Sequence, residues 1–258
     1  MRRFGCFAVL GMTVMLASCS VKEDRSTCPC WLQVNVSNVI VDKLQLRGWW
    51  NGEILFEKTL YRETPGGVLE FKVPRGTVEL SAIYGQMNLV ESAGALMLPK
   101  GSRMDSLFAY SAALDTRIDE VADTLALHKN FAHVVLDFKD VDDGRAGYDM
   151  KIKGNVSGLS VRTLDPIEGD FDIVPEDSEE RGYEFLLPRQ LDDSLTAEMW
   201  YKGKRIKTIP LGKYIAKAGF DWSLKDLGDI YILADLPGQK FTITIKDWEG
   251  PVLFTITI

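Results

Sequence analysis

The sequence predicts an all-β protein built from two tandem antiparallel β-sandwich domains. Short runs of alternating apolar and polar residues recur from Trp31 to the last residue, and such alternation places one face of each strand in a core. A polar, glycine-containing stretch at 140–147 separates two series of these runs. No strong amphipathic helix alternates with the strands, which favours antiparallel sandwiches over a parallel sheet. We therefore expect one sandwich at 31–143 and a second at 144–258.

The first series of alternating runs defines most of the expected N-terminal sandwich. Its apolar positions are Leu32, Val34 and Val36, then Leu69, Phe71 and Val73, then Val78, Leu80 and Ala82, and finally Val134, Leu136 and Phe138. Between Gly85 and Lys129 the alternation weakens. There we expect residues 112–125 to form either a short helix or a long loop.

The second series ends in an expected hairpin that runs to the last residue. Earlier strands are expected around Phe185 and Leu187 and from Leu195 to Tyr201. The hairpin has a first strand at 241–245 and a turn at 247–250. Its last strand has four apolar positions, which are Val252, Phe254, Ile256 and Ile258.

The N-terminus has the order of features that is typical of a secretory leader. Arg2 and Arg3 precede an apolar run of about 14 residues, which is shorter than the roughly 20 that a membrane-spanning helix needs. The run ends in Leu16-Ala17-Ser18-Cys19, which resembles a bacterial lipobox. The resemblance implies that residues 1–18 are removed, that Cys19 is acylated, and that residues 19–30 form a polar tether.

The charge of the chain argues against nucleic-acid binding. The formal net charge is −7, and it becomes −9 when Arg2 and Arg3 leave with a leader that contains no acid. Affinity for nucleic acid comes largely from Lys and Arg on phosphates, and this chain has no basic cluster in its sequence. We expect membrane attachment to come from the lipid rather than from electrostatic attraction to anionic lipids.

Two cysteines remain in the expected mature chain besides Cys19. Cys28 and Cys30 flank a proline, so a disulfide between them would be strained. A metal site would need two further ligands, and no His or other Cys lies nearby in the sequence. Structural or unpaired thiols, a strained or intermolecular disulfide, and a metal site all stay open.

The sequence offers little support for an enzyme, and we expect none. His128 and His133 are five residues apart without the acid of a metalloprotease helix, and no nucleophile elbow, phosphate loop or dinucleotide fingerprint occurs. We expect the ring of His133 to be solvated. The acids at 140–143 fail the EF-hand pattern, and the second acidic cluster at 165–180 suits a solvated loop better than a calcium site. We predict no metal and no cofactor apart from the lipid on Cys19.

Aromatic residues raise a separate hypothesis of glycan binding. Trp49 and Trp50 are adjacent, so in a strand they face opposite sides and one of them is expected in the core. Trp222 and Trp248 lie near expected turns. Under this hypothesis an exposed tryptophan, such as Trp49 or Trp248, stacks on a sugar ring.

Short motifs along the mature chain resemble one family of bacterial surface proteins. Lys22, Glu23 and Asp24 resemble the export signal that sends Bacteroidetes lipoproteins to the outside of the outer membrane. The segment 23–32 resembles the start of the fimbrial anchor family of type V pili, the lipoproteins associated with the major and minor fimbrillins. Further segments resemble the same family and occur in the same order along the chain. They are 131–138, 210–215, 221–222, 229–231 and 243–248.

The resemblance implies two transthyretin-like β-sandwiches, attached by lipid to the outer membrane, that bind pilin subunits at the base of a pilus. It implies a length-limiting role, because a subunit that cannot pass on to another one stops growth. Pilins of this type assemble by strand donation, and the strand with Val252, Phe254, Ile256 and Ile258 has a suitable pattern. That strand could equally be this chain's own last strand. A surface glycan-binding lipoprotein and a pilus tip adhesin are the alternatives.

Overall fold

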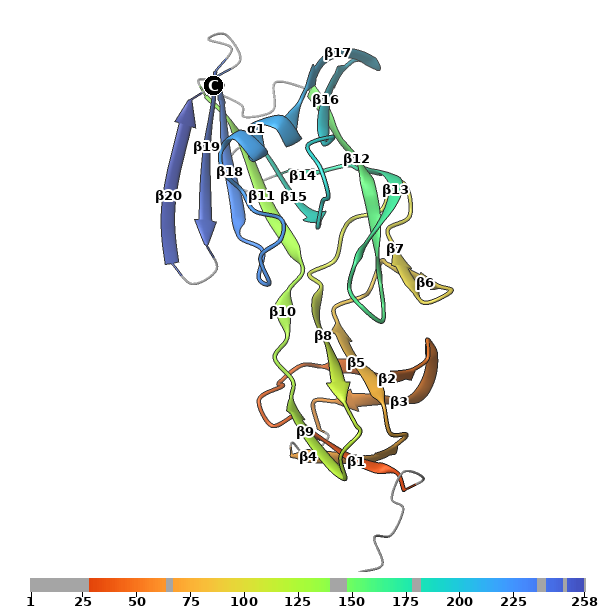
Figure 1. The fold of residues 1–258 in the computed structure, drawn as a ribbon. Helices are drawn as coiled ribbons and strands as arrows, with labels where there is room; N and C mark the ends of the chain where they lie inside the picture. Colours follow the sequence, from red (N-terminus) through yellow and green to blue (C-terminus); the bar gives the residue numbers. More distant parts are fainter. Residues whose placement is uncertain are drawn as a thin grey trace, which may run out of the picture.

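The computed structural model describes residues 28–63, 67–139, 148–177, 182–235, 240–247 and 250–257. The described part consists almost entirely of strands, and its one helix is α1 (Leu211–Lys217). The expected all-β sandwich class is confirmed. In Figure 1 the strands form two lobes stacked end to end, with β1 at the outer end of one lobe and β19 and β20 along one side of the other.

The first sandwich packs a three-stranded sheet against a five-stranded sheet. The smaller sheet has the order β4-β1-β9, with β4 at Val68–Val73, β1 at Cys30–Asn35 and β9 at Glu120–Thr124. The larger sheet has the order β10-β8-β5-β2-β3, with β10 at His128–Lys129, β8 at Phe108–Asp115, β5 at Thr77–Tyr84, β2 at Lys43–Trp50 and β3 at Glu53–Tyr61. The alternating apolar residues of β1 and β5 meet in one core, whose fully buried members include Leu32, Val34, Val78 and Leu80.

The second sandwich contains two larger sheets. One has the order β14-β15-β11-β18-β19-β20, with β14 at Glu176–Asp177, β15 at Tyr183–Pro188, β11 at Phe131–Phe138, β18 at Asp229–Asp235, β19 at Lys240–Asp247 and β20 at Gly250–Thr257. The other has the order β17-β16-β12-β7-β6, with β17 at Lys204–Ile209, β16 at Thr196–Tyr201, β12 at Tyr148–Ser160, β7 at Ala95–Met97 and β6 at Val90–Ser92. A further strand, β13 (Pro166–Ile173), pairs with β12.

Two strand pairs are parallel within these mainly antiparallel sheets. In the first sandwich β1 pairs with β9, and in the second β11 pairs with β18. Each pair joins segments about 90 or more residues apart, as Trp31 with Glu120 and Val134 with Ile230. Such pairing needs a long crossover, and the intervening strands supply it.

The sheet pairing does not follow the boundary expected between residues 143 and 144. β11 precedes that boundary, yet it pairs with β15 and β18 of the second sandwich. β6 and β7 also precede it and join β12. The polar stretch at 140–147 therefore connects two strands of the second sandwich, and such a stretch looks the same in sequence whether it joins strands or domains.

The short helix or long loop expected at 112–125 is wrong. The end of β8 and the whole of β9 occupy this segment, joined by a short connection. β8 lies between β10 and β5, and Ala112 and Ala113 pair with Leu80 and Glu79. Small and polar residues on both faces hid the strand period from the sequence pattern.

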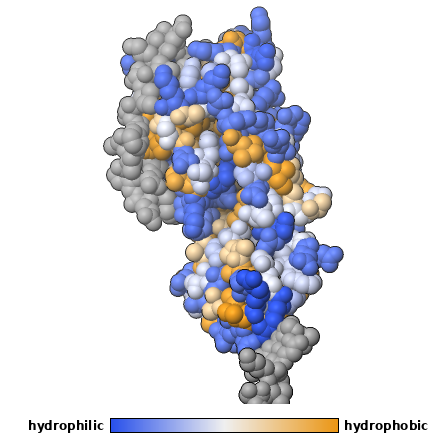
Figure 2. Space-filling model, in the orientation of Figure 1, coloured by the Kyte–Doolittle hydropathy of each residue, from blue (hydrophilic) through white to orange (hydrophobic). Residues whose placement is uncertain are grey.

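The two sandwiches pack against each other through apolar and polar contacts. Trp49 and Ile83, from strands of the first sandwich, belong to the same core as the buried residues of the second. Arg162 Nη1 lies 2.6 Å from Glu79 Oε2 across the junction. On the face seen in Figure 2 hydrophilic residues predominate, hydrophobic ones form small patches, and the surface narrows between the lobes.

Candidate functional site

The expected lipidation and export residues lie outside the described part of the chain. These residues are Cys19, Lys22, Glu23 and Asp24. Their assignments stay predictions. No helix in the described ranges is long and apolar enough to cross a membrane.

Cys28 and Cys30 are both free thiols with different surroundings. Cys28 is exposed, whereas Cys30 is fully buried at the start of β1. Burial raises the pKa of the Cys30 thiol, and the nearby Arg75 partly offsets this effect. Among the described residues no group of three or more His, Cys, Asp or Glu side chains is placed to hold a metal ion.

The expected terminal hairpin is confirmed for its described residues. β20 pairs antiparallel with β19, with Phe254 opposite Ile245 and Ile256 opposite Ile243. β20 is the last strand of its sheet, so one side of its backbone faces away from β19. Val252 also lies in β20, and Ile258 lies outside the described residues. In this structure the strand completes its own sheet, and its outer side forms an edge that a further strand could join.

Of the two adjacent tryptophans, one is buried and the other is exposed, as strand geometry predicts. Trp49 is buried, with 6% of its surface exposed, and its indole N–H donates to Ser81 Oγ at 2.9 Å. Trp50 is exposed. Stacking of a sugar on Trp49 is therefore wrong, because its ring is inside the core. Trp222 is half-buried against Phe220, and Trp248 lies outside the described residues.

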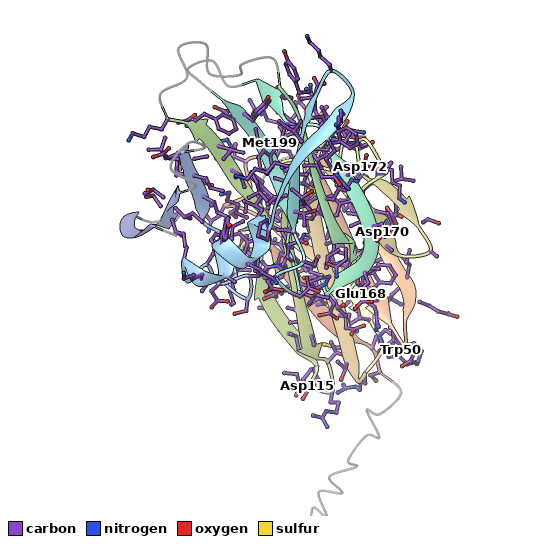
Figure 3. The ribbon with its side chains drawn as sticks, turned by 90° about the horizontal axis from the view of Figure 1, so that it is seen from above. Trp50, Asp115, Glu168, Asp170, Asp172 and Met199 are labelled. Carbon is purple, nitrogen blue, oxygen red and sulfur yellow. The ribbon has the colours of Figure 1, made fainter. Side chains whose placement is uncertain are left out.

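Three acids of the second acidic cluster lie on β13. Glu168, Asp170 and Asp172 follow one another along this strand (Figure 3). Asp172 Oδ1 accepts the backbone N–H of Gly101 at 3.0 Å. The segment expected to be a solvated loop is thus partly a strand, because β12 offers it a long antiparallel partner. The other expected acidic group, at 140–143, lies outside the described residues.

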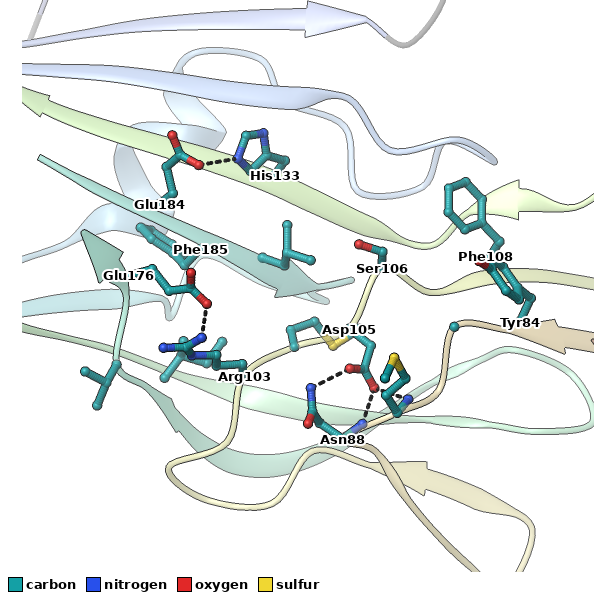
Figure 4. A pocket seen from close by; sticks show the side chains of 16 residues that line it. Tyr84, Asn88, Arg103, Asp105, Ser106, Phe108, His133, Glu176, Glu184 and Phe185 are labelled. Atoms are coloured by element: carbon teal, nitrogen blue, oxygen red, sulfur yellow. Dashed lines mark hydrogen bonds and ion pairs between the residues drawn. The ribbon is translucent and has the colours of Figure 1, made fainter. Parts of the chain in front are cut away.

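A groove lies beside the junction of the two sandwiches. Its volume is about 530 Å³, within the range of ligand sites. We call it the junction groove, and Figure 4 shows it. It is lined by Tyr84, Gly85, Met87, Asn88, Arg103, Met104, Asp105, Ser106, Phe108, His133, Ile173, Val174, Glu176, Glu184, Phe185 and Leu186.

One wall of the junction groove is a loop held in place by a buried carboxylate. Asp105 Oδ2 accepts the backbone N–H groups of Met87, Asn88 and Leu89 at 2.7, 2.6 and 3.1 Å. Its Oδ1 accepts the side-chain amide of Asn88 at 2.6 Å. The carboxylate is 6% exposed, so these four bonds replace its water. Asp105 therefore fixes the shape of this wall.

A glycine brings the two segments of this wall close together. Gly85 has φ +93°, and a Cβ added there would lie 2.2 Å from the backbone oxygen of Ser106. Both the positive φ and the close approach require glycine. The chain can thus leave β5 and pass directly beside the segment that carries Asp105.

Two pairs of polar side chains and several apolar side chains complete the lining of the groove. His133 Nε2 lies 3.6 Å from Glu184 Oε2, and Arg103 pairs with Glu176. The ring of His133 is half-buried, so the expectation of a fully solvated ring is only partly met. Phe185 and Ile173 add apolar surface to the groove. The arrangement suits binding of an amphipathic ligand, with apolar contacts in the floor and charges at the rim.

Sequence reasoning did not find the junction groove. Its lining comes from residues 84–108, nearly all of them in the weakly patterned segment, and from four strands of the second sandwich, which are β11, β13, β14 and β15. Asp105 could have been noticed only as an acid between apolar neighbours, Met104 and Leu107, which are both buried.

Comparisons with known proteins establish the fold of the chain. No protein-family model matches the chain, and no curated protein matches it. Among solved structures, the fimbrial anchor protein Mfa2 from Porphyromonas gingivalis matches with a TM-score of 0.59 at 14% identity, over 88% of this chain and 99% of that one. The chain has the fold of a fimbrial anchor protein.

Two other solved structures share this fold. A candidate polysaccharide-binding protein from Bacteroides thetaiotaomicron matches with a TM-score of 0.61 at 18% identity, over 85% of this chain and 96% of that one. A candidate adhesin from the same species matches with a TM-score of 0.58 at 15% identity, over 86% of this chain and 97% of that one. The TM-scores establish the shared fold, and the low identities leave the function to be proposed.

Proposed function

We propose that this chain is a fimbria-associated surface lipoprotein that holds the base of a pilus to the outer membrane. The observation that carries the proposal is the fold shared with Mfa2, which spans both sandwiches. The lipobox-like sequence ending at Cys19 adds a means of attachment. Acylation with two or more chains anchors stably, whereas one chain holds only marginally.

The two ends of the molecule suit this role. The described chain starts at Cys28 at one end of the first sandwich, and β20 runs along the side of the second sandwich, in the lobe farther from Cys28 (Figure 1). A lipid on Cys19 would hold the first end at the membrane. The free edge of β20 would then lie along the side of the lobe that is farther from the membrane, where a pilin strand could pair with its backbone.

The test of anchoring is electron microscopy of cells and culture medium after Cys19→Ala, with the protein level checked by blotting. We expect bald cells and filaments in the medium. Filaments that stay attached although the protein has left the membrane would overturn the proposal. Released filaments that still carry the protein would favour a tip adhesin or another pilus subunit.

We further propose that the protein limits pilus length. A subunit that accepts a pilin but passes on none of its own strand ends the assembly. Cells that lack the protein are expected to form longer or shed filaments, measured by electron microscopy. Unchanged lengths in the deletion strain would reject this role while leaving attachment open.

The contact with a pilin can be tested at the edge of β20. A photocrosslinking residue in place of Thr255 should capture a pilin subunit in fimbriated cells. The same residue in place of Tyr61 is the matched control, because β3 is also the last strand of its sheet but lies in the first sandwich. Equal capture at both positions would argue against a specific role for β20.

Glycan binding is a second candidate function. It is favoured by the shared fold with the candidate polysaccharide-binding protein, and by the exposure of Trp50. A polysaccharide array that gives a signal with the native protein and loses it with Trp50→Ala would support this function. An array without any signal would remove it.

A further inference from the structure

Three large apolar side chains are exposed around the point where the described chain begins. Trp31, Trp50 and Ile118 are 44%, 37% and 59% exposed. They come from the start of β1, the end of β2 and the connection between β8 and β9. Isolated exposed apolar residues are ordinary, so their significance depends on whether these three lie together.

Backbone and side-chain contacts connect the three positions into one rim. The backbone N–H of Trp31 donates to the oxygen of Asp119 at 2.9 Å, which brings the segment that carries Ile118 close to the start of β1. The N–H of Thr116 donates to Gly76 O at 2.8 Å. A Cβ on Gly76 would lie 3.6 Å from Trp50 Nε1, so this indole is next to the same turn.

Arg75 joins this rim to the first described residue. Its Nε donates to the backbone oxygen of Cys28 at 2.8 Å, and its other nitrogens bond to Arg117 O and to the Asp119 carboxylate. Figure 3 shows Trp50 and Asp115 at this end of the first sandwich. We call Trp31, Trp50, Arg75, Arg117 and Ile118 the exit rim.

We infer that the exit rim is a lipid-contact surface, on which the first sandwich rests against the headgroup region of the membrane that holds Cys19. This inference rests on the lipid attachment in the proposed function. Indole rings prefer the membrane–water interface because they combine an apolar body with a polar N–H.

The length of chain before Cys28 makes this contact effective although it is small. Cys19 and Cys28 are nine residues apart in the sequence, a separation that spans at most about 30 Å when extended. Tethering over so short a distance gives a local concentration in the millimolar range, so weak contacts become populated. The three side chains need only orient the sandwich, since the lipid supplies the attachment.

The charges of the exit rim indicate that its contact with the membrane does not depend on anionic lipid. Arg117 pairs with Asp115 at 2.7 Å, and Arg75 pairs with Asp119. Lys72 Nζ lies 4.9 Å from the centre of the Trp31 ring. Because the cations are balanced by acids, we expect the contact to change little when salt is raised to about 0.5 M.

The test uses the acylated full-length mature protein on phosphatidylcholine vesicles that contain brominated phosphatidylcholine, which quenches indole fluorescence on contact. We expect quenching in the native protein, a clear loss of it in Trp50→Ser, and no loss in the control Trp222→Phe in the second sandwich. A protein that floats with the vesicles but shows the same quenching in Trp50→Ser and in the native protein would overturn the inference and leave the lipid anchor intact. An acylated protein that does not float would overturn the anchor and the rim together.

A second measurement leaves the tryptophans unchanged. Cys28 is exposed at the exit rim, and Cys30 is buried, so one native thiol reports on this surface. A membrane-impermeant maleimide should label Cys28 more slowly on vesicles than on the soluble Cys19→Ala chain. Equal labelling rates would overturn the contact even if the Trp50 variant failed to fold.

Discussion

Replacement of Asp105 by alanine tests whether one carboxylate shapes the junction groove. The change removes the acceptor of three backbone N–H groups and of the Asn88 side-chain amide. Leaving buried donors unpaired costs about 1–3 kcal/mol each, and hydrogen bonds to a charged group contribute about 1.5–3 kcal/mol. Water can reach part of this open groove and replace some of the bonds. We therefore expect a total loss of about 3–5 kcal/mol in the free energy of unfolding, which is about the cost of leaving two buried donors unpaired.

The loss can be measured by urea unfolding followed by tryptophan fluorescence and by thermal unfolding. For a chain of this size 1 kcal/mol corresponds to about 2–4 °C in Tm, so the expected decrease in Tm is about 6–20 °C. Asp105→Asn keeps an acceptor oxygen without the charge, and we expect it to lose about 1–2 kcal/mol. Asp165→Ala, which removes an exposed loop aspartate of the second sandwich, is the control. A loss below about 1 kcal/mol in Asp105→Ala would refute the idea that this carboxylate holds the loop.

Three other predictions concern single sites. Gly85→Ala should destabilise the protein by more than about 1 kcal/mol in urea unfolding, because both the φ of +93° and the Ser106 oxygen oppose a Cβ. Gly52 also has a positive φ (+83°) but lies in open space, so Gly52→Ala should destabilise the protein less. In native protein, Cys28 should react with a thiol reagent and Cys30 only after unfolding, as read by mass spectrometry, since burial removes access and raises the pKa of Cys30; equal reactivity would contradict this. Hydrogen bonds from Arg117 lower the pKa of Asp115 to about 2, so the stabilisation from this pair is present above the usual aspartate range and is lost as pH falls through about 2. In an NMR titration, Arg117→Ala should return the midpoint of Asp115 towards the ordinary value. An unchanged midpoint would contradict the assignment.

Strands with strong alternation were predictable from the sequence, and those with weak alternation were not. The runs around Leu32, Leu80 and Leu136 all form strands with one buried face. β8 carries alanines and serine on a half-buried face, so its period had little contrast in hydrophobicity. β9 has only five residues and depends on its parallel partner β1 for its pairing.

Features that depend on pairing between distant segments were the hardest to predict. The membership of β11 in the second sandwich is decided by β15 and β18, about 50 and 100 residues further along the chain. Likewise the junction groove forms only when the segment carrying Asp105 meets β13 and β15. Local periodicity contains no information on which strands become neighbours. By contrast, the opposite fates of Trp49 and Trp50 follow from strand geometry alone.

The position of β1 in its sheet has a mechanical consequence. β1 is the first described strand after the N-terminal segment, and it is the middle strand of three. Its ladder with β4 extends from Cys30 to Asn35, and its ladder with β9 from Trp31 to Asn35. A tensile load that enters the chain from its N-terminus is therefore shared by hydrogen bonds on both sides of one strand. An edge strand would peel from a single neighbour one bond at a time, whereas β1 can detach only when both ladders rupture.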